Sequence, residues 1–60
     1  MILTKKMQDI MAKINDVGYY RITALTKTKT LIALRRMADK GMLKTLVMTE
    51  SYIDVGKNWN

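Results

Sequence analysis

The sequence predicts a small α+β domain in which helices come first and a β-hairpin comes last. Two observations support this class. Apolar residues recur at helical spacing in the first two thirds of the chain, and strand-forming residues dominate positions 42–55. The chain has 60 residues, of which 48% are hydrophobic, and it contains no proline. This length suits one domain with a single core, placed at residues 1–60.

The first helix is expected over residues 4–16. Thr4 is placed as its N-cap, because a threonine hydroxyl accepts a free N–H group of the first turn. Gly18 stands where a left-handed residue commonly ends a helix. The helix carries one apolar stripe, formed by Met7, Ile10, Met11, Ile14 and Val17.

An extended segment and a turn follow this helix. The run Tyr19-Tyr20-Arg21-Ile22 favours a short strand. Residues 23–25 suit a very short second helix of one or two turns, packed on the core. Residues 26–28 form the turn before the next helix, and Thr26 or Thr28 is a candidate cap for it.

A longer helix is expected over about residues 28–40, with Gly41 as its end and Lys40 near the negative end of its dipole. A projection at 100° per residue gives it two sides. The side expected to face the core carries Leu31, Leu34, Met37 and Ala38. The opposite side carries Lys29, Ala33, Arg36 and Lys40. The two flanks carry Ile32 and Arg35.

Two strands complete the expected fold. Residues 42–48 and 52–55 are rich in strand formers, and the polar run Thr49-Glu50-Ser51 separates them. Together they predict an antiparallel hairpin.

Charge and composition narrow the function. Eleven Lys and Arg residues against five Asp and Glu residues give a net charge of +6, which favours a polyanionic partner such as nucleic acid. The chain has no cysteine and no histidine, its carboxylates are scattered, and its three glycines are isolated. We therefore expect no enzyme, no metal site and no cofactor. The lack of a signal peptide or a membrane-spanning segment predicts a cytoplasmic protein.

The order of these elements, with the run Leu34-Arg35-Arg36-Met37-Ala38-Asp39-Lys40-Gly41-Met42-Leu43, resembles the winged helix-turn-helix superfamily over residues 4–55. The resemblance implies three helices followed by a two-stranded antiparallel wing, and in this chain the second helix is expected to be very short. It also implies that residues 28–40 form the recognition helix. The chain departs from the family's pattern at its short second helix and at Glu50 in the wing tip, which argues against minor-groove contact by the wing.

The expected function is sequence-specific binding of double-stranded DNA by a small transcription regulator. An arginine contacts guanine through two hydrogen bonds, whereas Ile32 and Ala33 suit thymine methyl groups. Lys27 and Thr28 are placed to hold phosphate at the helix N-terminus. The predicted DNA-binding residues are Lys27, Thr28, Lys29, Ile32, Ala33, Arg35, Arg36 and Lys40.

Other interpretations remain open. The basic side is also compatible with a solvated face on a structural helix. The main alternative function is a protein-interaction module that docks on an acidic partner, such as a component of the transcription or replication machinery. Single-stranded nucleic acid is less favoured because aromatic residues are few, and we expect no membrane partner. A homodimer is compatible with DNA binding, and an apolar stripe on the first helix wider than its core would indicate one.

Overall fold

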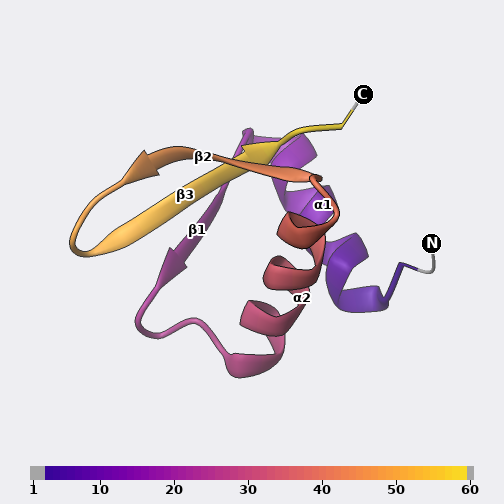
Figure 1. Ribbon diagram of the computed structural model, residues 1–60, viewed down its shortest axis with the longest axis horizontal. Coiled ribbons are helices and arrows are strands. Elements are labelled where there is room, and N and C mark those ends of the chain that lie inside the picture. The colour runs from indigo at the N-terminus through magenta and orange to yellow at the C-terminus, as the bar shows by residue number, and fades with distance from the viewer. Residues whose placement is uncertain (1–2, 60) are drawn as a thin grey trace.

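The computed structural model describes residues 3–59, in which two helices pack together and cover one face of a three-stranded antiparallel sheet (Figure 1). The sheet has the order β1-β3-β2, so β3 is central and pairs with both neighbours. The predicted α+β class and C-terminal hairpin are confirmed. The elements are α1 (Lys5–Val17), β1 (Tyr20–Thr23), α2 (Thr28–Asp39), β2 (Leu43–Met48) and β3 (Tyr52–Lys57).

Local signals set both ends of α1. Thr4 Oγ1 accepts a hydrogen bond from the backbone N–H of Met7 at 3.2 Å, which confirms the predicted N-cap. Gly18 has a φ of 94° and donates its N–H to the carbonyl oxygen of Ile14 at 2.8 Å. A residue with a side chain is strained at this φ, which explains why a glycine ends the helix.

The apolar stripe of α1 is almost entirely used by the core. Met7, Ile10 and Ile14 are buried, and Met11 packs against the same cluster. Only Val17, at the C-terminal end of the stripe, is exposed. The stripe is therefore not wider than the core that covers it, and α1 offers little apolar surface to a second copy.

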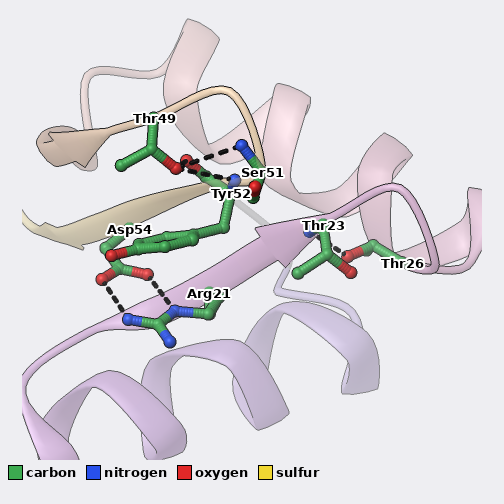
Figure 2. Close-up of polar contacts among 7 residues, drawn as sticks. All are labelled: Arg21, Thr23, Thr26, Thr49, Ser51, Tyr52 and Asp54. Atoms are coloured by element: carbon green, nitrogen blue, oxygen red, sulfur yellow. Dashed lines mark hydrogen bonds and ion pairs between the residues drawn. The ribbon is translucent and has the colours of Figure 1, made fainter.

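The short second helix predicted over residues 23–25 is absent, so that prediction was wrong. The hydroxyl of Thr26 accepts a hydrogen bond from the N–H of Thr23 at 2.9 Å (Figure 2). The hydroxyl of Thr23 accepts one from the N–H of Leu25 at 3.1 Å. Threonine side chains thus satisfy backbone groups in a turn, which is how such residues compete with helix formation. The described chain has two helices instead of the three expected.

The core face of α2 also differs from the prediction. The helix buries Thr30, Ala33, Leu34 and Met37. Leu31 and Ala38, which were expected to face the core, are exposed. At 100° per residue, this difference is a rotation of roughly 60° about the helix axis. Because α2 contacts both α1 and the sheet, packing on two sides sets its rotation.

A tight turn connects α2 to the hairpin. The N–H of Met42 donates to the carbonyl oxygen of Met37 at 3.0 Å, and Gly41 between them has a φ of 74°. This six-residue closure around a left-handed glycine is the usual Schellman end of a helix. The turn directs the chain from α2 into β2.

The left-handed turn gives a test of the fold. We expect Gly41→Val to lower the free energy of unfolding by about 1–2 kcal/mol, because a β-branched residue is strained at positive φ. Gly41→Asn is the matched control, since asparagine tolerates this region better. Urea denaturation followed by circular dichroism measures both variants. Equal midpoints for the valine and asparagine variants would contradict a strain-based role for Gly41.

Candidate nucleic-acid interface

The outward face of α2 combines apolar and basic side chains. Leu31 and Ile32 are 41% and 47% exposed. Side chains three or four positions apart lie on the same face of a helix, which places Ile32 close to Arg35 and Arg36. These side chains line a shallow surface hollow formed by Thr28, Leu31, Ile32, Arg35 and Arg36.

The one acidic residue of α2 does not neutralise this face. Arg35 Nε lies 4.0 Å from Asp39 Oδ2, and both side chains are largely exposed to solvent. A solvent-exposed pair at this helical spacing contributes only about 0.3–0.5 kcal/mol, and salt screens it further. The guanidinium of Arg35 is therefore free to exchange Asp39 for a stronger acceptor.

The N-terminus of α2 has no side-chain cap. Its N-cap residue is Lys27, which makes no capping hydrogen bond, so the prediction that Thr26 or Thr28 caps this helix was wrong. The hydroxyl of Thr26 is held in the preceding turn. The N–H of Leu31 donates to the carbonyl oxygen of Lys27 at 3.0 Å. The N–H groups of residues 28–30 come before this bond, in the first turn, where a helix provides no carbonyl acceptor for them. This electropositive end suits a phosphate.

The structure places most of the predicted interface on the surface of α2 and its ends. The exposed members are Lys27, Thr28, Lys29, Ile32, Arg35, Arg36 and Lys40. Lys40 lies at the far end, about 18 Å from Thr28 by helix rise. Ala33 is 5% exposed and belongs to the core, so its predicted contact with a thymine methyl was wrong. Leu31 takes its place at the surface because the helix is rotated.

The β2–β3 hairpin projects away from both helices (Figure 1) and offers no cation at its tip. Thr49 holds the tip closed, because its hydroxyl accepts hydrogen bonds from Ser51 N at 3.2 Å and Tyr52 N at 3.0 Å (Figure 2). Glu50 is exposed in this loop. Between Lys44 and Lys57 the hairpin has no basic residue, so its tip has no positive charge to attract a phosphate.

A charged pair that the sequence did not reveal joins β1 to β3. Arg21 lies opposite Asp54 and donates two hydrogen bonds to its carboxylate, at 2.8 and 2.9 Å (Figure 2). The guanidinium also lies 3.9 Å from the ring centroid of Tyr52. Strand register brings together residues 33 positions apart, so no local pattern signals the pair. Arg21 therefore serves the sheet and is not counted in the interface.

This pair makes stability depend on pH. The hydrogen bonds from Arg21 lower the pKa of Asp54, although burial of the carboxylate opposes them. A carboxylate with a lowered folded-state pKa stabilises the fold above its ordinary pKa of about 3.9. That contribution is lost as the pH falls through the folded-state value.

Acid unfolding tests the pair. We expect the melting temperature of the wild type to fall more steeply than that of Asp54→Asn between about pH 5 and pH 2. The variant cannot ionise at this position, so it lacks the corresponding proton uptake. Thermal melts across this range measure the difference. Parallel curves for the two proteins would rule out Asp54 as a source of the acid sensitivity.

No family model matches the chain, and no curated protein or solved structure is significantly similar to it. Within residues 3–59, neither helix has the length and apolarity needed to cross a bilayer. The same part of the chain holds no group of three or more carboxylates placed to bind a metal ion. A functional assignment therefore depends on the geometry and charge of the exposed α2 face.

Proposed function

We propose that this domain binds double-stranded DNA by placing the exposed face of α2 in the major groove. The observation that carries the proposal is the gathering of Arg35 and Arg36 on one exposed helix face, beside an uncapped, lysine-bearing N-terminus. The major groove, about 12 Å wide, admits an α-helix. An arginine in the groove recognises guanine by donating to O6 and N7.

The two parts of the helix suit different contacts. Lys27, Lys29 and the free N–H groups of the first turn fit the phosphate backbone, which positions a protein on the duplex. Arg35, Arg36 and Ile32 lie further along the exposed face and suit base edges, which carry the sequence information. The domain would then act as a small transcription regulator by occupying its site.

The architecture supports a winged-helix arrangement in part. A helix followed directly by an antiparallel hairpin matches the recognition helix and wing of that superfamily. The helix before the recognition helix is replaced by the threonine-stabilised turn. In this proposal α1 and the sheet form the support that holds α2 outward, and the tip of the hairpin, which has no cation, makes no strong phosphate contact.

DNA titration tests the proposal directly. Fluorescence anisotropy with a labelled mixed-sequence duplex, at about 50 mM and about 200 mM salt, measures affinity and its salt dependence. We expect wild-type binding at low salt that weakens steeply at the higher salt, because each phosphate contact releases counterions. The double variant Lys29→Ala/Arg36→Ala should lose most of this affinity and keep its circular dichroism spectrum.

A matched control distinguishes binding through a specific surface on α2 from general attraction by the net positive charge of the domain. Lys6 and Lys13 are exposed on α1, so Lys6→Ala/Lys13→Ala removes the same charge from a different surface. The control should bind DNA nearly as well as the wild type. Equal losses in the two double variants would count against α2 as the interface. Failure of the folded wild type to bind any duplex at low salt would overturn the proposal.

One observation favours a protein-interaction module as a second candidate. Towards the tip of the hairpin, where no cation is present, the edge strand β2 exposes the large apolar side chains of Leu46, Val47 and Met48. Such a patch suits another protein better than it suits DNA. In that case DNA affinity is weak and insensitive to Lys29 and Arg36, and the basic surface attracts an acidic partner.

A further inference from the structure

We propose that Ile32, with Leu31 beside it, makes the DNA site depend on the C5-methyl group of a thymine. This inference rests on the proposed DNA-binding function and names the base that the apolar part of the α2 face recognises. Ile32 would be a specificity-determining residue, whereas the neighbouring arginines contact guanine.

The position of Ile32 distinguishes it from other exposed apolar residues. Single exposed apolar side chains are common in proteins, and Leu25 in the β1–α2 turn is almost fully exposed but does not line the hollow on α2. Ile32 instead lies one helical turn from both Thr28 and Arg36 on the face of α2. With Leu31 it forms the apolar part of the hollow that the two arginines border.

The chemistry of the major groove selects thymine as the partner of this surface. Thymine is the one base of unmodified DNA that presents an apolar group there, the C5-methyl. The groove edges of guanine, adenine and cytosine present hydrogen-bonding groups. An isoleucine packed on such a group would remove water from it without supplying a partner, which is unfavourable.

The surrounding charge supports a DNA occupant for this apolar surface. Arg35 and Arg36 flank Ile32, and Lys29 lies near the N-terminal end of the same helix. These cations complement the phosphates on either side of a groove. The major groove holds thymine methyl groups between two rows of phosphates, so duplex DNA offers a partner both for Ile32 and for the cations around it.

Replacing thymine with uracil isolates the methyl group. Sites are first enriched from a random duplex pool with the wild-type domain, and each thymine of the enriched site is then replaced singly by deoxyuridine. Uracil keeps the hydrogen-bonding groups of thymine and lacks its methyl. At one or two positions we expect Kd to rise about fourfold, the effect of burying one methyl-sized group.

Variants assign the effect to Ile32. Ile32→Ala should bind the thymine and uracil forms of the site equally, because the side chain that contacts the methyl is truncated. Leu25→Ala removes an exposed apolar side chain outside α2 and should keep the wild-type difference. Alanine favours the helix and Ile32 lies outside the core, so the variant is expected to fold.

The outcomes separate this inference from the proposed function. Equal wild-type affinity for thymine and uracil at every position would overturn the inference and leave DNA binding intact. The inference is also overturned, with DNA binding left intact, if the protein binds the random pool without enriching any sequence. It is overturned likewise if Ile32→Ala shows the same rise in Kd on replacement of thymine by uracil as the wild type. Absence of any duplex binding at low salt would overturn both the inference and the proposed function.

Discussion

Met37→Ala is expected to leave the domain largely unfolded at room temperature. Met37 has no measurable exposure (0%) and belongs to the core cluster formed by both helices and β3. Truncating a buried side chain of this size costs about 2–5 kcal/mol, because apolar contacts are lost and a cavity remains. A single core in a chain this short supplies only about 3–5 kcal/mol of net stability.

Urea denaturation followed by circular dichroism measures this effect against two controls. Met48 is 69% exposed, so Met48→Ala makes the same chemical change and should alter stability by no more than about 0.5 kcal/mol. Met37→Leu keeps the volume and should cost less than about 1.5 kcal/mol. A cooperative transition for Met37→Ala near that of the wild type would show that the core does not depend on this side chain.

Arg36→Ala is expected to weaken binding to the enriched DNA site about five- to 150-fold, the effect of losing a two-bond contact with guanine worth about 1–3 kcal/mol. Its effect on an unrelated duplex should be much smaller. Lys29→Ala should weaken both duplexes to a similar extent. It should also reduce the slope of log affinity against log salt by about 0.9, because one phosphate contact is lost.

Isotherms at several salt concentrations, on the enriched and the unrelated duplex, distinguish these roles. Lys13→Ala, on the exposed side of α1, controls for the loss of one positive charge. If Arg36→Ala weakens both duplexes equally and reduces the salt slope, Arg36 is a phosphate contact instead of a base contact. If neither variant differs from Lys13→Ala, the exposed face of α2 is not the DNA-binding surface.

Most of the exposed interface was predictable because charged side chains are rarely buried in a small domain. Arg35, Arg36 and the lysines at the start of α2 are exposed in the structure, as their charge predicts. The apolar part was not predictable in the same way. Leu31 and Ala33 both suit a core by composition, and the rotation of α2 buries Ala33 and exposes Leu31. Tertiary packing therefore decides which apolar side chains line the hollow on α2.

By itself, the sequence determined the features that depend on neighbours within a few positions. The cap at Thr4 and the helix ends at Gly18 and Gly41 follow from hydrogen bonds and backbone angles inside one turn. The hairpin follows from two strand-forming runs around a polar turn. These features are found in the fold as predicted because their stability depends on interactions between residues that are close in sequence.

Only the tertiary structure decided which face of α2 is buried and which residues meet across the sheet. The rotation of α2 depends on packing against α1 and the sheet at once, and the partner of Arg21 depends on the register of β1 on β3. The turn at residues 23–26 replaces a helix because its hydroxyl–backbone bonds outcompete one or two isolated helical turns. Helical periodicity describes one element at a time, whereas these outcomes depend on the packing free energy of several elements together.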